Sequence, residues 1–95
     1  MTYNGYTNYE TWLVQLWFSN DESCLLHWEE QAERAVRDSI DPAGSLARDM
    51  EEGVRDLMAE SNLEGLLADL LSSAVSEVNW AEIANHYVEG VHAEV

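Results

Sequence analysis

The stretch NYETWLVQLWFSND, residues 8–21, places aromatic and leucine residues between polar residues that are typical of helix ends. Thr7 and Glu10 fit a capping box, which predicts a helix start near Thr7. Five large apolar residues recur at the spacing of one helical face, namely Tyr9, Trp12, Leu13, Leu16 and Trp17. Because burying each large side chain stabilises a small domain by ~1.5–3 kcal/mol, we expect this stripe to face the core. Val14 and Phe18 widen it.

Capping residues predict four further helices along the chain. Their starts are Asn20 or Asp21, Asp41 followed by Pro42, Ser61 with Glu64, and Asn79 with Glu82. We expect the second helix to end near Ser39, and Gly90 to end the last one. In each of these helices one set of apolar residues is expected to face inward. In chain order the sets are Leu25, Trp28, Ala32, Ala35 and Val36 in the second helix; Leu46, Met50, Val54, Leu57 and Met58 in the third; Leu63, Leu66, Leu67, Leu70, Leu71, Ala74 and Val75 in the fourth; and Trp80, Ile83, Ala84, Tyr87 and Val88 in the fifth.

Length and composition limit the architecture. A chain of 95 residues is too short to divide into two parts that each bury a sufficient core. Its hydrophobic content of 46% argues against a disordered acidic tail. No run of alternating β-branched residues is long enough to predict a strand. We therefore expect an all-α fold, with residues 1–95 forming one acidic domain, a compact bundle of about five short helices.

The charge balance points to the class of partner. The chain has nineteen acidic residues, four arginines and no lysine, which gives a formal net charge of −15. Such a surface repels nucleic acid and anionic membranes, and it favours a basic protein partner. Helical spacing predicts that Arg48 pairs with Glu52 and that Glu51 pairs with Arg55.

No pattern predicts catalysis or a cofactor. The only cysteine, Cys24, lacks the surroundings of a nucleophile, and a packing role is expected for it. Glu89 and His92 have the spacing of a di-metal motif, but such sites need two motifs and this chain has one. We therefore predict a protein that is not an enzyme and holds no metal. The lone cysteine, the lack of an apolar leader and the lack of a membrane-spanning run favour the cytoplasm.

The two ends of the chain carry motifs that resemble a known group of proteins. NYETW at residues 8–12, NDE at residues 20–22 and NWAEIANHY at residues 79–87 are similar to motifs of small phage, prophage and mobile-element proteins. The resemblance implies an origin in a virus or mobile element, hence the cytoplasm of an infected bacterial or archaeal host. It implies no biochemical activity. Each motif also has a structural origin, since each is a capped helix start followed by aromatic core positions.

The acidic surface is the main candidate for function. Asp49, Glu52, Asp56 and Glu60 are expected on one helical face, with a carboxylate every ~4.5–6 Å along the axis. Phosphates along one DNA strand repeat at a comparable rise of a few ångströms. Four further carboxylates would extend this row if the helices pack side by side: Asp38, Asp41, Glu64 and Asp69.

Two functional hypotheses follow from these features. The leading one is a DNA mimic, an anti-CRISPR or anti-restriction protein that blocks the basic nucleic-acid-binding surface of a host defence complex. The alternative is a homo-oligomeric structural or regulatory module of a phage, a homodimer for example. An apolar patch would carry that contact, with Tyr3, Tyr6, Val14, Phe18 and Leu26 as its members. An ordinary solvated surface and adaptation to a salt-loving host would each also account for the acidity.

Overall fold

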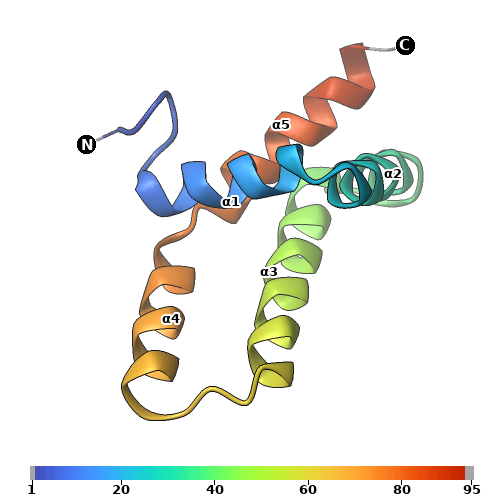
Figure 1. Cartoon of the computed structure of the whole chain (residues 1–95). Coiled ribbons are helices and arrows are strands. Elements are labelled where there is room, and N and C mark those ends of the chain that lie inside the picture. The colour runs from blue at the N-terminus through green and yellow to red at the C-terminus, as the bar shows by residue number, and fades with distance from the viewer. Residues whose placement is uncertain (1, 94–95) are drawn as a thin grey trace.

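The computed structural model describes residues 2–93 and contains five α-helices in that part of the chain (Figure 1). Their bounds are α1 (Tyr9–Asn20), α2 (Glu22–Asp38), α3 (Pro42–Glu60), α4 (Gly65–Glu77) and α5 (Trp80–Ala93). The described residues form no strand beyond one isolated bridge between Tyr3 and Tyr6. The expected all-α, single-domain bundle of five helices is confirmed.

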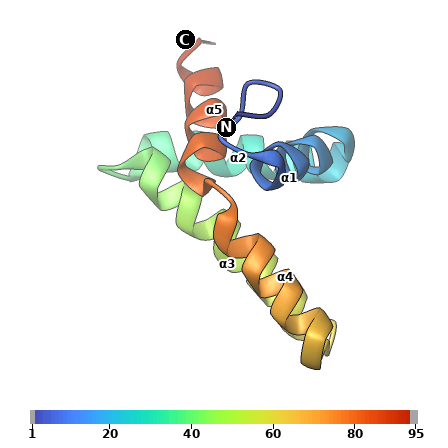
Figure 2. The ribbon, with the colours of Figure 1, turned by 90° about the vertical axis from the view of Figure 1, so that its left-hand side faces the viewer.

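The helices form a body and a projecting hairpin. α3 packs against α5 and α2, and α1 packs against α2, α4 and α5. α4 contacts only α1 and α3 among the described elements. In Figure 1, α3 and α4 descend together to the loop that joins them, and in Figure 2 they run along the same diagonal away from α1, α2 and α5. The molecule therefore measures 46 Å along its longest axis, against 30 and 26 Å along the others.

α5 is the central helix of the core, and its expected inward face is confirmed. All five of its predicted core residues are buried: Trp80, Ile83, Ala84, Tyr87 and Val88. α3 contributes Leu46 and Met50, which are fully buried, and α2 contributes Trp28, Ala32 and Ala35. Leu25 and Val36 of α2 pack at the edge of this cluster.

α1 turns a different face inward from the one that its aromatic stripe predicted. Its buried residues are Thr11, Gln15 and Phe18. Trp17 is 68% exposed, and Tyr9 is also exposed. The prediction for these two residues was wrong because helical spacing shows which residues share a face, without showing which face meets the rest of the protein.

Polar contacts with α5 account for the rotation of α1. The Thr11 hydroxyl accepts a hydrogen bond from the Asn79 backbone amide at 2.8 Å. The Asn79 side-chain amide donates to the Thr7 hydroxyl at 3.1 Å, and the Thr7 backbone amide donates to Glu82 Oε1 at 2.9 Å. These bonds join the N-termini of α1 and α5, so the polar side of α1 must face inward.

The start of α1 therefore differs from the expected capping box. Asn8 is the N-cap, and its Oδ1 accepts from the Thr11 amide at 2.9 Å. The Asn8 side-chain amide also donates to the Glu77 carbonyl at 2.7 Å. At α5 the cap is as predicted, since Asn79 Oδ1 accepts from the Glu82 amide at 3.1 Å. The Glu82 side chain reaches Thr7 instead of closing a capping box.

The chain before α1 folds back onto the aromatic stripe. Asn4 and Gly5 have positive φ values of 48° and 88°, which a tight turn between Tyr3 and Tyr6 requires. The Tyr3 ring then packs on Tyr9 and Trp12, with ring centroids 5.1 and 4.9 Å apart. This contact partly covers side chains that the core leaves outside.

Two other helix boundaries differ from expectation. Ser61 does not cap α4; its amide bonds to carbonyls of the last turn of α3, and α4 begins at Gly65 without a side-chain cap. Gly90 does not end α5, which continues to Ala93. Asp41 and Pro42 start α3 as predicted, and Asp21 caps α2, which ends at Asp38.

Candidate partner-binding surfaces

The four carboxylates of α3 form an exposed row. Asp49, Glu52, Asp56 and Glu60 all lie on the solvent side of the helix, and none forms an ion pair within residues 2–93. The row spans twelve residues of helix, from Asp49 to Glu60, or roughly 16 Å along the axis. We call these four residues the α3 acidic row. Leu46 and Met50, which are fully buried, anchor the N-terminal half of the same helix in the core.

The structure places only some of the other four predicted residues beside the row. All four are exposed: Asp38, Asp41, Glu64 and Asp69. Asp38 lines the same shallow hollow as Asp49, although Arg37 pairs with it at 3.4 Å. Asp41 caps α3 by accepting from the Gly44 amide at 3.1 Å. Asp38 is therefore the one of these four residues that lies next to the row, at its N-terminal end.

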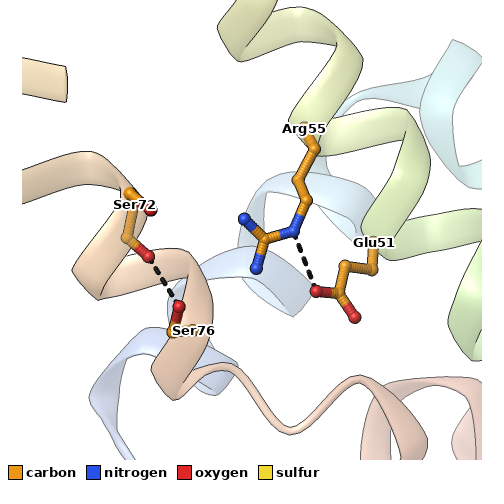
Figure 3. A network of polar contacts seen from close by, with 4 residues as sticks. All are labelled: Glu51, Arg55, Ser72 and Ser76. Carbon is orange, nitrogen blue, oxygen red and sulfur yellow. Dashed lines mark hydrogen bonds and ion pairs between the residues drawn. The ribbon is translucent and has the colours of Figure 1, made fainter. Parts of the chain in front are cut away.

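Glu64 and Asp69 lie beyond the other end of the row. Glu64 occupies the N-cap position of α4 and makes no capping hydrogen bond. Asp69 faces a hollow between α3 and α4 that Arg55 and Ser72 also line. Arg55 extends toward α4 in Figure 3 and is held by Glu51, with Nε 2.9 Å from Oε2. Asp69 therefore lies beside a basic group, on a different side of α3 from the acidic row.

The arginines neutralise little of the acidic surface. The pair of Glu51 with Arg55 is confirmed, whereas Arg48 forms no ion pair with Glu52 in the described chain. Ion pairs in residues 2–93 involve Arg37 and Arg55 only. Because both pairs are partly exposed, they contribute little to stability.

α4 carries an exposed apolar face that the sequence did not predict. Leu66, Leu67 and Leu70 were expected in the core, yet they are 73%, 61% and 58% exposed. The α4 residues turned toward α3 include Ala68, Leu71 and Ser72, and only Val75 is buried. Ser76 donates to the Ser72 carbonyl at 2.9 Å, a bond within α4 itself (Figure 3). We call Leu66, Leu67 and Leu70 the α4 leucine face.

The apolar patch that the sequence predicted for self-association cannot include Phe18. Phe18 is buried and stacks on Trp28, with ring centroids 5.4 Å apart. Tyr3 and Leu26 are exposed, while Tyr6 and Val14 are half-buried. Leu57 of α3 is also exposed, which corrects its assignment to the core. Three of the exposed large apolar residues lie on α4, whose apolar positions exceed what α1 and α3 can cover.

The cysteine and the Glu89–His92 pair that the sequence singled out lie on different helices, α2 and α5. Within residues 2–93, no group of three or more His, Cys, Asp and Glu side chains is placed to hold a metal ion. Cys24 is half-buried at the start of α2, and Glu89 and His92 are exposed on α5. None of the helices in this part of the chain has the length and apolarity to cross a membrane.

The fold and its surfaces define an acidic, all-α, single-domain protein. Residues 1–93 match the model of DUF7249, a family of unknown function, and the chain belongs to that family. No curated protein and no solved structure matches the chain.

Proposed function

We propose that this chain is a phage or mobile-element protein that binds the basic, nucleic-acid-binding surface of a host defence complex, such as a CRISPR effector or a restriction enzyme. The α3 acidic row is the observation that supports this proposal. Its carboxylates are exposed and lack arginine partners in the described chain, so their charge is available to another protein. The resemblance of both end motifs to phage proteins supports a host target.

The proposed mechanism is competition with nucleic acid. Carboxylates spaced ~4.5–6 Å along a rigid helix present acceptors to the lysine and arginine side chains that otherwise contact phosphates. No covalent step is required, and no residue of this chain acts catalytically. Complementary charge accelerates association, and salt screens that attraction. Binding should therefore weaken steeply as ionic strength rises.

Capture from a bacterial lysate tests the proposal. The chain is immobilised, and the retained proteins are released in separate experiments by duplex DNA and by rising salt. We expect nucleic-acid-handling proteins that DNA displaces. Changing Glu52→Gln together with Asp56→Asn should abolish their capture while leaving the folded state intact, because both residues are exposed.

A control variant on another helix separates this surface from general attraction. Glu22→Gln with Glu30→Gln removes the same amount of charge from exposed positions of α2. It should retain the captured proteins. Equal loss in both double variants, or capture that DNA does not displace, would contradict a role for the α3 acidic row.

The α4 leucine face favours a second candidate function, a homo-oligomeric module. A helix that carries apolar side chains on nearly all sides is usually covered, and large exposed apolar patches mark protein contacts. The mass in solution, measured by light scattering over a wide range of protein concentration, tests this candidate. A dimer that Leu67→Ser with Leu70→Ser dissociates, but that Ile40→Ser at a fully exposed position leaves intact, would support it.

A further inference from the structure

An open groove of about 410 Å³ lies where the end of α1, the first half of α2 and the middle of α3 meet. Its wall is mainly apolar. Phe18 lines it from α1, Trp28 from α2, and Val54 and Leu57 from α3. We call it the Trp28 groove.

The groove combines a packed aromatic pair with an exposed leucine. Phe18 and Trp28 are buried and stack on each other, with ring centroids 5.4 Å apart. Leu57 is 63% exposed, so a large apolar side chain beside this pair remains in contact with water. Covering it would be favourable, because apolar area would leave water. Protein interfaces commonly place an apolar anchor residue in such a pocket.

Gly53 keeps the groove open beside the Trp28 ring. It lies inside α3, where glycine is less favourable than alanine. A Cβ at this position would come no closer to the Trp28 ring than 3.8 Å, an ordinary contact, so the packing does not require a glycine. The missing side chain therefore leaves space that a side chain of another protein can occupy.

The α3 acidic row runs along one edge of the Trp28 groove. Asp49 belongs to both. Each of the other three carboxylates of the row follows a groove residue by three positions, and residues three apart are neighbours on a helix surface. No arginine is among the described residues that line the groove. An apolar groove with a negative edge is complementary to a segment that carries an apolar side chain among basic ones.

We propose that the Trp28 groove receives an apolar side chain of the basic partner, from a segment whose flanking lysines or arginines pair with the α3 acidic row. This inference deepens the proposed function, on which it rests for the identity of the partner. Charge attraction mainly accelerates the encounter, whereas a buried apolar anchor stabilises the complex once it has formed. A second copy of this chain is a poorer occupant, since both copies carry a net charge of −15.

Titration of the isotope-labelled chain by NMR with acetylated and amidated tripeptides tests the groove directly. The first tripeptide has tryptophan between two lysines, the second has alanine in place of the tryptophan, and the third has glutamates in place of the lysines. We expect saturable shifts of the Gly53 amide and the Leu57 methyl groups with the first, and binding about tenfold weaker or more with the second. The third should bind more weakly still. Equal binding of any two of them would overturn the proposal.

Two variants of the groove have matched controls elsewhere. Gly53→Leu should fill the groove and Leu57→Ser should remove its apolar rim, and each should weaken binding of the tryptophan tripeptide by about tenfold. Gly90→Leu, where a Cβ meets no atom within 4 Å, and Leu26→Ser, at an exposed position of α2, should bind it as the unchanged chain does. Leu57 is exposed, so Leu57→Ser should fold even if Gly53→Leu does not. Equal binding by groove and control variants would overturn the proposal, as would the same shifts on concentrating the chain alone, which would assign the groove to a second copy.

The lysate capture separates this inference from the proposed function. We expect Leu57→Ser to lose the proteins that DNA displaces and Leu26→Ser to retain them. Retention of these proteins by both Leu57→Ser and Gly53→Leu would overturn the inference and leave the proposed function intact. If the tryptophan tripeptide binds as expected but DNA displaces none of the captured proteins, the proposed function fails, and the groove remains a site for a basic, apolar segment of another protein.

Discussion

The backbone amide of Asn79 donates a hydrogen bond of 2.8 Å to the hydroxyl of Thr11, a residue 68 positions earlier in the chain. The same hydroxyl donates to Asn8 Oδ1 at 2.6 Å, so it connects the N-caps of α1 and α5. Thr11 is fully buried, and water cannot replace these bonds. The two sequence motifs at the ends of the chain are therefore one structural unit.

Thr11→Val should destabilise the fold because it preserves the side-chain shape and removes the hydroxyl. The Asn79 amide then loses its acceptor, at a cost of about 1–3 kcal/mol. Urea unfolding followed by tryptophan fluorescence measures the change. Thr2→Val, at an exposed position, is the control and should have little effect. A loss of similar size for both variants would contradict the role of the Thr11–Asn79 bond.

Phe18→Ala and Trp17→Ala should differ sharply despite being neighbours. Phe18 is buried against Trp28, and its removal should cost about 3–5 kcal/mol through the cavity it leaves. Trp17 is mostly exposed, and its removal should change stability by no more than ~0.5 kcal/mol. Chemical denaturation of both variants decides which face of α1 is the core face. A larger loss of stability for Trp17→Ala than for Phe18→Ala would show that the face predicted from helical spacing is the core face.

Leu46→Ala and Leu67→Ala provide the same comparison for leucines. Leu46 is fully buried in α3, and truncation there should cost about 2–5 kcal/mol. Leu67 is 61% exposed, so truncation should cost at most ~0.5 kcal/mol in the monomer. Unfolding should be followed at several protein concentrations. A large effect of Leu67→Ala that grows with concentration would indicate that a second copy covers the α4 leucine face.

The raised pKa of Tyr87 predicts how stability depends on pH. Below its ordinary pKa of 10.0, Tyr87 is protonated in both the folded and the unfolded chain, so its contribution is fully present. Above that value the unfolded chain releases the proton first, and the free energy of unfolding falls as pH rises. In an absorbance titration of the folded chain, Tyr87 should also ionise above its ordinary pKa. Tyr87→Phe should remove this part of the pH dependence.

Tyr87→Phe should also leave the stability of the fold at neutral pH nearly unchanged. The hydroxyl makes no hydrogen bond of regular geometry, although the Gln15 side chain lies beside it and lowers its pKa, so its removal should cost the fold little. Thermal unfolding at neutral pH measures the effect. Clear destabilisation would show that the hydroxyl is satisfied in solution, by an ordered water for example.

The α3 acidic row and the arginine pairs show which surface features helical spacing can predict and which it cannot. Helical spacing placed Asp49, Glu52, Asp56 and Glu60 on one side of a helix, and all four are exposed there. It also predicted the contact of Glu51 with Arg55. It did not place Asp69, which depends on how α4 is oriented beside α3. The hollow that Gln15, Glu29 and Tyr87 line had no signal in the sequence, because α1, α2 and α5 create it together.

The sequence by itself determined the class of fold, most helix boundaries, and the core faces of α2 and α5, because capping chemistry and apolar spacing act within one helix. Only the tertiary structure decided which faces of α1 and α4 meet the core. For α1, Thr11 and the hydrogen bond that it accepts from the Asn79 amide lie inside, whereas Tyr9 and Trp17 of the aromatic stripe lie outside. For α4 the apolar residues exceed the surface that its two neighbours can cover, so the leucines remain outside. Both outcomes depend on contacts between distant segments, which local periodicity does not encode.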